Sequence, residues 1–335
     1  MLILSLFAGQ NALKYGIFLT LDFIWFKLIT AVILLKSFSE VFMTKTNVTI
    51  HTAGSTIEGF LSIPKSNDLL PAIVFANGYC AYHEMYDHMA DAFNKAGFVT
   101  LQYEPRGSSG SRHGFQLCGT EWLDDITAAI SYVCGLEEVD SERVGLAGVS
   151  MGGAMTVIQA ARDKRIKAVY IMAPYINGEL NFKNCFIENS GQKAWDSFLA
   201  MMERNASAVA QGCPSEYVPE NMSCFSGLFG EPSADELEAR RLHPLKITRL
   251  PLESVYNVYL HVDALAEAGK LTVPALLVHG TGDTTLDYKN SHILFDALGS
   301  QIKKFELIPD AEHVLPEVEP ELITNMGLDW FIEYL

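Results

Sequence analysis

The chain contains 335 residues, of which 49% are hydrophobic, and it carries a formal net charge of −16. This composition is that of a globular protein, and the length permits either one large core or two domains. The acidic balance argues against nucleic acid and anionic membrane surfaces as main partners, because both would repel it. The six Cys include no C-x-x-C pair, so we expect reduced thiols and no metal centre, with a Cys213–Cys224 bridge as the alternative.

Residues 1–42 form a hydrophobic extension. A 21-residue apolar stretch at 15–35 is interrupted by Asp22 and Lys27, which brings insertion into a bilayer close to break-even. No small-residue cleavage site follows it. Three interpretations stay open: an uncleaved membrane anchor, a hydrophobic helix packed on the body or on a partner chain, or upstream sequence with translation starting at Met43. We favour the last two and predict a cytoplasmic protein, whose membrane contact, if any, comes only through this extension.

From residue 43 onward, strand patterns alternate with helix patterns. Strands at 47–50 and 56–63, joined by a Gly54-Ser55 turn, predict an antiparallel edge. A continuous apolar run predicts a strand buried on both faces at 71–76. Further strands are predicted at 98–103, 144–149, 166–172, 274–279 and 303–308. Helical patterns lie at 83–95, 121–133, 154–161, 287–298 and 320–335. This order predicts an α/β fold with a doubly wound, mostly parallel sheet of about eight strands, which binds ligands beyond the carboxyl ends of its strands.

The alternation stops between residues 175 and 270, which are richer in Pro, Asn, Ser, Met and Cys. We predict an inserted helical cap there, with helical pieces at 193–211 and 233–241, so that the core comprises 43–174 and 271–335. Apolar cap residues would line an acyl pocket, although plain helix packing explains their spacing better. They are Trp195, Phe198, Met201, Met202, Phe225, Leu228 and Phe229.

The strand at 144–149 runs into Gly148-Val149-Ser150-Met151-Gly152, and a helix follows. A G-x-S-x-G pattern alone is a weak signal. Here it lies between a buried strand and a helix, where the close backbone of a sharp turn requires Gly at both flanks and strain holds the serine oxygen clear of the sheet. We predict that Ser150 is a nucleophile.

Two further strands end in side chains that a serine nucleophile needs. The strand at 274–279 is followed by Asp283, and the strand at 303–308 by His313. A serine hydroxyl needs a base within hydrogen-bond reach, and the base needs an acceptor on its other nitrogen. His313 is the predicted base and Asp283 the predicted acid, with Asp310 as a rival acid that is better suited to shaping the turn. His279 is interpreted as a packed core residue.

Acyl transfer also needs donors for the oxyanion. The backbone N–H of Met151, directly after the nucleophile, is one candidate. The second candidate is the N–H of Tyr79, in the loop after the strand at 71–76, where Gly78 lets the chain turn inward. An ordinary strand-to-helix turn is the alternative for this loop.

From about Thr46 to the C-terminus, these motifs resemble the α/β-hydrolase superfamily, and within it the group of monoacylglycerol lipases, cinnamoyl esterases and serine aminopeptidases. The resemblance implies Ser150, Asp283 and His313 as the catalytic triad and Tyr79 and Met151 as oxyanion donors. The chain departs from the group at Asn77 and Glu104, where His and Asp are usual. The motifs are Asn77-Gly78 with His83, Glu84 and Tyr86; Glu104-Pro105-Arg106-Gly107-Ser108-Ser109-Gly110-Ser111; Gly148 to Gly153; and His279-Gly280-x-Gly282-Asp283 with Glu312-His313.

The sequence therefore predicts a serine hydrolase that cleaves a small carboxylic ester with an apolar acyl group, through an acyl-enzyme intermediate and without metal or cofactor. An amide or peptide hydrolase with the same triad is the nearest alternative, because acidic cap residues would receive a free amine. These residues are Glu216, Glu220, Glu231, Asp235 and Glu236. A catalytically silent binding protein of the same fold is the second alternative. Acyl length, alcohol group and oligomeric state stay open.

Overall fold

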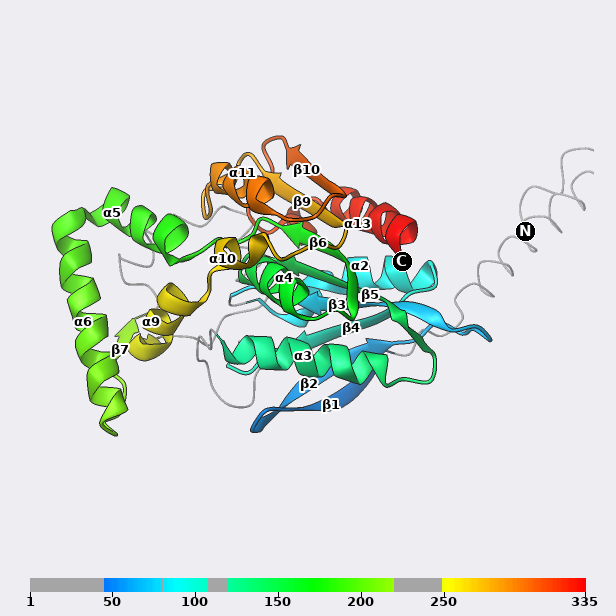
Figure 1. The fold of residues 1–335 in the computed structure, drawn as a ribbon, viewed down its shortest axis with the longest axis horizontal. Helices are drawn as coiled ribbons and strands as arrows, with labels where there is room; N and C mark the ends of the chain where they lie inside the picture. Colours follow the sequence, from blue (N-terminus) through cyan, green and yellow to red (C-terminus); the bar gives the residue numbers. More distant parts are fainter. Residues whose placement is uncertain (1–44, 80, 108–119, 220–248) are drawn as a thin grey trace, which may run out of the picture. The chain divides into compact units, whose positions relative to one another are not determined.

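The structure is a computed structural model, and it describes residues 45–79, 81–107, 120–219 and 249–335 (Figure 1). The hydrophobic extension and the predicted helix at 233–241 lie outside these residues, so both stay predictions, as does the cytoplasmic location. Within the described residues, every helix is too short or too polar to cross a bilayer.

An eight-stranded sheet forms the centre of the fold, in the order β1-β2-β4-β3-β5-β6-β9-β10 (Figure 1). β1 and β4 pair antiparallel with β2, and the remaining neighbours are parallel. The predicted doubly wound, mostly parallel α/β sheet is therefore confirmed. The strands are β1 (Thr46–Thr52), β2 (Ser55–Ser62), β3 (Leu70–Ala76), β4 (Val99–Glu104), β5 (Val139–Val149), β6 (Ile166–Met172), β9 (Ala275–Gly280) and β10 (Lys303–Ile308).

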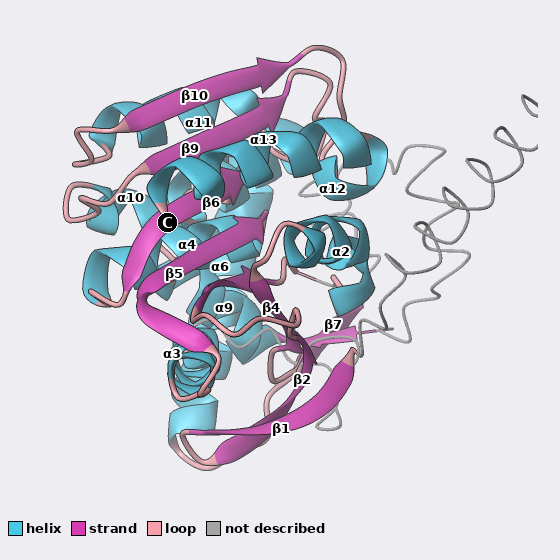
Figure 2. Cartoon of the chain, turned by 90° about the vertical axis from the view of Figure 1, so that its right-hand side faces the viewer, coloured by secondary structure: helices cyan, strands magenta, loops and turns pink. Residues whose placement is uncertain are grey.

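Helices cover both faces of the sheet. In β3, Ala72, Val74 and Ala76 pack into one hydrophobic cluster, whereas Ile73 and Phe75 pack into the other. This alternation explains why the central strands read as unbroken apolar runs. The first cluster includes α3 (Glu121–Cys134), α4 (Met151–Arg162), α10 (Ala264–Ala268) and α11 (Tyr288–Ala297). The second includes η1 (His83–Tyr86), α2 (Asp87–Lys95), α12 (Leu315–Val318) and α13 (Pro320–Tyr334), of which Figure 2 shows α2, α12 and α13 on one side of the sheet.

The cap segment, residues 175–270, leaves the sheet after β6 and returns before β9. Its helices α5, α6 and α9 lie to one side of the sheet in Figure 1. Helix α6, predicted at 193–211, spans Gln192–Ala210. Trp195, Phe198 and Met202 are buried within the segment's own aromatic cluster, as expected for helix packing. The other elements are η2 (Gly178–Lys183), α5 (Asn184–Ser190), β7 (Tyr217–Pro219), β8 (Arg249–Pro251) and α9 (Leu252–His261).

The two ends of the cap segment are joined beside the core. The N–H of Ala264 donates to the carbonyl of Ile176 at 2.8 Å, and Asn177 bridges to Asp263 across the same junction. Cys213, proposed above as one end of a disulfide, is a free and exposed thiol.

Candidate active site

Ser150 occupies a sharp turn between β5 and α4. Its φ of 58° and ψ of −121° place a residue with a side chain in the left-handed region, a conformation that costs about 1–3 kcal/mol and is held by its surroundings. The Ser150 N–H donates to Met172 at 3.0 Å, and the Ser150 carbonyl accepts from Tyr175 at 3.0 Å and Ala154 at 3.2 Å. Backbone bonds to the neighbouring strand and helix therefore fix the turn.

The glycines around Ser150 are required by close backbone approach. A Cβ on Gly148 would lie 2.3 Å from the carbonyl oxygen of Gly152, and a Cβ on Gly152 would lie 2.0 Å from that of Ala76. Neither space admits a side chain. The N-terminus of α4 thus rests on the end of β3, as the G-x-S-x-G pattern predicts.

The loop after β3 passes directly beside Ser150. A Cβ on Gly78 would lie 3.3 Å from the Cβ of Ser150 and 3.1 Å from the carbonyl oxygen of Val149. The buried amide of Asn77 donates to the carbonyl of Tyr103 at 3.0 Å, which ties the loop to β4. Tyr79 follows, packed against both the core and the aromatic cluster of the cap segment.

Tyr86 joins the ends of the two strands at this point. Its hydroxyl donates to the carbonyl of Ala76 at 2.8 Å and accepts the N–H of Val149 at 3.0 Å. Burial raises the pKa of Tyr86, against the lowering effect of the Val149 N–H, so the phenol stays neutral and keeps its proton. The sequence placed Tyr86 only within a family motif and did not identify this bridge.

The loops that carry Asp283 and His313 also pack backbone against backbone. A Cβ on Gly280 would lie 2.1 Å from the carbonyl oxygen of Ala311, and the N–H of Gly282 donates to that oxygen at 3.0 Å. Across this contact, His313 Nδ1 lies 2.6 Å from Asp283 Oδ2. The structure therefore brings the predicted acid and base together in a charge-assisted hydrogen bond.

Asp310, the rival acid, lies exposed on the same loop with a φ of 57°. Its backbone N–H donates a hydrogen bond to the Thr281 hydroxyl at 2.9 Å. Asp310 shapes the turn, as its spacing from His313 suggested. Asp287 likewise caps α11 by accepting the N–H of Lys289.

Ser150, Asp283 and His313 all follow the carboxyl ends of parallel strands. Val149 is in register with Met172, and Met172 with Val278, while β9 and β10 stay paired up to Gly280 and Ile308. The turns after β5, β9 and β10 consequently lie along one edge of the sheet, where ligands of such sheets bind. Met151 and Gly78 flank Ser150 at the same edge.

Asp283 is a buried carboxylate with a full set of donors. Its Oδ1 accepts the N–H groups of Thr285 and Leu286, both at 2.8 Å, and its Oδ2 contacts His279 Nε2 at 2.8 Å in addition to His313. Burial alone would raise the pKa of Asp283, but the two histidines outweigh it and hold that pKa well below its usual range. Asp283 is therefore ionised near neutral pH.

His279 is the site residue that the sequence did not identify. It is fully buried, as expected of a core residue, but its ring contacts the predicted acid. The available signal was the spacing of His279 and Asp283 across the tight Gly280-x-Gly282 turn, which returns the carboxylate toward the end of β9.

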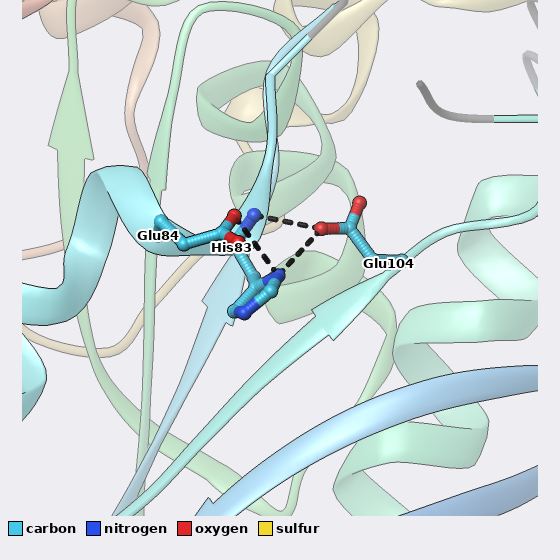
Figure 3. Close-up of side chains that lie close together, drawn as sticks. All are labelled: His83, Glu84 and Glu104. Carbon is cyan, nitrogen blue, oxygen red and sulfur yellow. Dashed lines mark hydrogen bonds and ion pairs between the residues drawn. The ribbon is translucent and has the colours of Figure 1, made fainter. Parts of the chain in front are cut away.

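His83, Glu84 and Glu104 are the described side chains that come closest to a metal-ligand set (Figure 3). His83 Nδ1 lies 2.8 Å from Glu104 Oε1 and 3.2 Å from Glu84 Oε2. Glu104 Oε1 also accepts the backbone N–H of His83 at 2.8 Å, and the imidazole stacks on Phe60. Hydrogen bonding accounts for this cluster without a metal, and it anchors the start of η1, just after Tyr79, to the end of β4.

The fold and the arrangement of loops at its carboxyl edge define an α/β-hydrolase. Residues 69–321 match the model of the family described as serine aminopeptidase, S33. The chain belongs to this family.

The chain is also similar to individual proteins. An uncharacterized 31.7 kDa protein from the traX-finO intergenic region of Escherichia coli is 24% identical over 299 residues, which cover 86% of this chain and 99% of that protein. A monoacylglycerol lipase of Mycolicibacterium smegmatis is 23% identical, covering 78% of this chain and 88% of the lipase. The solved structure of DcsB with its substrate analogue superposes with a TM-score of 0.71 at 20% identity, covering 87% and 99%.

The Tyr86 bridge predicts a stability effect. Tyr86→Phe removes a hydroxyl that pairs two buried backbone groups, so we expect a loss of about 1–3 kcal/mol in the free energy of unfolding, measured by urea denaturation at pH 7. Tyr175→Phe is the matched control, because the buried Tyr175 hydroxyl lacks a hydrogen-bond partner in the described structure. Equal stability of the two variants would contradict the bridge.

The depressed pKa of Asp283 predicts how stability varies with pH. The ordinary pKa of an unfolded Asp is about 3.9, so the stabilisation by the ionised group is complete above that pH and is lost as pH falls toward the lower folded-state pKa. Asp283→Asn cannot titrate. We expect wild type to be more stable at pH 5 and its advantage to shrink by about 1 kcal/mol at pH 3, by urea denaturation of both proteins. A constant difference would refute the shift.

Proposed function

We propose that the protein is a serine hydrolase that cleaves carboxylic esters in two steps through an acyl-enzyme intermediate. Ser150 Oγ attacks the ester carbonyl while His313 accepts its proton. The same imidazole then returns the proton to the leaving alcohol, and water repeats the sequence to release the acid. Asp283 holds the imidazole through Nδ1, so that Nε2 exchanges the proton, and stabilises the imidazolium.

The negative charge that develops on the carbonyl oxygen would be held by the backbone N–H groups of Met151 and Tyr79. The contact of Gly78 with Ser150 supports this role, because donors are effective only when they are fixed beside the reacting carbon. Each such donor is worth about 3–4 kcal/mol of barrier. The reaction as proposed uses neither metal nor cofactor.

The observation that carries the proposal is the 2.6 Å contact of His313 with Asp283 on the sheet edge that also bears the strained Ser150 turn. Burying an ionised carboxylate beside an imidazole costs desolvation free energy, and perturbed titratable groups in such positions often mark catalytic sites. The similarity to a monoacylglycerol lipase supports an ester as substrate.

We further propose that residues 175–270 act as a cap that selects the substrate. Tyr79 contacts the cap's aromatic cluster, which includes Phe182 and Trp195. An apolar acyl group entering between cap and sheet edge would meet these aromatic surfaces. The family's description as serine aminopeptidases favours amide hydrolysis as the second candidate.

Replacing the nucleophile gives the first test. Ser150→Ala should lower kcat/KM for p-nitrophenyl butyrate by roughly 10³-fold or more, with unchanged circular dichroism and urea midpoint. A fluorophosphonate probe should label wild type at Ser150 and leave the variant unlabelled. Labelling of neither protein would favour a silent binding protein of the same fold.

The choice between ester and amide can be measured directly. Wild type should turn over p-nitrophenyl acetate and butyrate faster than aminoacyl p-nitroanilides, and turnover should vary along a series of acyl chain lengths. The esters release p-nitrophenol and the anilides release p-nitroaniline, so each rate is calculated with the absorption coefficient of its own product and corrected for the Ser150→Ala background. Faster turnover of the anilides would replace the ester proposal with the peptidase one.

A further inference from the structure

His279 contacts Asp283 from within the protein interior. It is the next-to-last residue of β9 and is fully buried. Its Nε2 lies 2.8 Å from Asp283 Oδ2 and 3.0 Å from the carbonyl oxygen of Leu286, and its Nδ1 lies 2.7 Å from Ser291 Oγ, which α11 contributes. Both ring nitrogens are therefore engaged.

These partners place a hydrogen on Nε2 of His279, because the two atoms near Nε2 are both acceptors. Nδ1 faces the Ser291 hydroxyl, a group that serves as donor or acceptor. A chain of hydrogen bonds runs from Ser291 through His279 to Asp283 Oδ2, where it meets the bond from His313.

Resting on the proposed function, we propose that His279 and Ser291 are positioning residues that hold the carboxylate of Asp283 in the orientation its bond to His313 requires. The backbone N–H groups of Thr285 and Leu286 fix Oδ1. The His279 N–H fixes Oδ2 from the buried side, so that the carboxylate cannot rotate about its final bond. Oδ2 then presents its remaining lone pair to His313 Nδ1.

Several titratable groups lie around Asp283 and affect its interaction with His313. His313 and His279 are the groups that lower the pKa of Asp283 against its burial. On the elements packed around them, Asp310, Asp287 and His292 are exposed, and Glu312 is partly buried beside His313. By holding Oδ2 in place, the His279 N–H keeps the carboxylate charge of Asp283 next to the His313 ring.

A purely packing role explains His279 poorly. The residues before it in β9, Leu276, Leu277 and Val278, are aliphatic and buried. An aliphatic residue at 279 would continue that pattern without any polar group to satisfy. A fully buried imidazole destabilises the folded state unless both of its nitrogens form hydrogen bonds. Here one of those bonds is made with Asp283, the proposed catalytic acid.

Two substitutions of His279 separate positioning from packing. His279→Leu keeps an apolar volume but removes the N–H, whereas His279→Gln retains an amide N–H near the position of Nε2. With p-nitrophenyl butyrate we expect kcat to fall about 10- to 100-fold in the Leu variant. The acidic limb of its kcat/KM profile should move to lower pH by roughly half a unit or more, because a carboxylate that is no longer held against Nδ1 stabilises the imidazolium less. The Gln variant should retain the wild-type limb.

Ser291→Ala tests the same chain one step further from the acid, in case the His279 variants fail to fold. The matched control is Thr324→Val, because Thr324 Oγ1 forms a similar bond with His88 Nδ1, at 2.9 Å, on the other face of the sheet. Ser291→Ala should lower kcat roughly 3- to 10-fold and shift the acidic limb, whereas Thr324→Val should leave both unchanged. Equal effects of the two variants, or an unmoved limb in Ser291→Ala, would overturn the positioning role.

A readout that does not need turnover separates this inference from the proposed function. The Nδ1 proton of His313, in its 2.6 Å bond to Asp283, should give a far-downfield resonance in ¹H–¹⁵N spectra. We expect that resonance to move upfield or broaden in His279→Leu and Ser291→Ala and to persist in Thr324→Val. A resonance unchanged in all three variants would refute the positioning role even if the protein proves to be an active esterase. A change confined to the first two would support it even if no ester is hydrolysed.

Discussion

The contacts that fix this site are made by backbone atoms, at the carboxyl edge of the sheet. Gly152 lies against the carbonyl of Ala76, and Gly280 lies against the carbonyl of Ala311, each with no space for a Cβ. The turns after β3 and β5 touch through their main chains, as do the turns after β9 and β10, so neither turn of each pair can move alone. Reactive side chains must be held within about 0.5 Å of their working geometry, and a layer of interlocked turns provides that tolerance better than side-chain packing.

A second constraint comes from burying a charge in that layer. Asp283 is ionised and almost without solvent contact, which is strongly unfavourable for an isolated carboxylate. Two backbone N–H groups and two imidazoles supply four donors to its two oxygens. These donors offset the loss of hydration, and they also determine which way the carboxylate faces. In this site the requirements of stability and of orientation are therefore met by the same bonds.

Much of this arrangement follows from the sequence, and the exceptions have physical reasons. Strands at 166–172 and 303–308 were predicted to the residue, because each carries several apolar residues at a point where the regular alternation of strands and helices requires a strand. β5 begins at Val139, before its predicted start, because its first half includes the polar run Ser141 to Arg143, where hydropathy gives no strand signal. The pairing of Asp283 with His313 was predicted from their places after neighbouring parallel strands.

The sequence did not reveal two kinds of contact. Some join residues that are far apart along the chain, and others involve residues that fit an ordinary amphipathic helix pattern. Tyr86 bridges β3 and β5 through one hydroxyl, and Ser291 pairs with His279 from the buried face of a helix. A buried Tyr or Ser is common in any amphipathic helix, so composition cannot distinguish it from packing. Only the positions of the acceptor atoms in three dimensions identify these roles.

The loop after β3, which carries the proposed oxyanion donor Tyr79, packs against both the core and the cap segment. Asn77 bonds to β4, Tyr86 bonds to β3 and β5, and Glu104 anchors the N–H of His83, so the core holds both ends of the loop. Tyr79, between these anchors, also contacts the cap's aromatic cluster. A change in the packing of the cap segment would therefore reach the loop at Tyr79, whose N–H is the proposed donor, while the bonded ends resist displacement. Under the proposed function, the cap segment would influence reactivity as well as access, because Tyr79 belongs to the loop that passes beside Ser150.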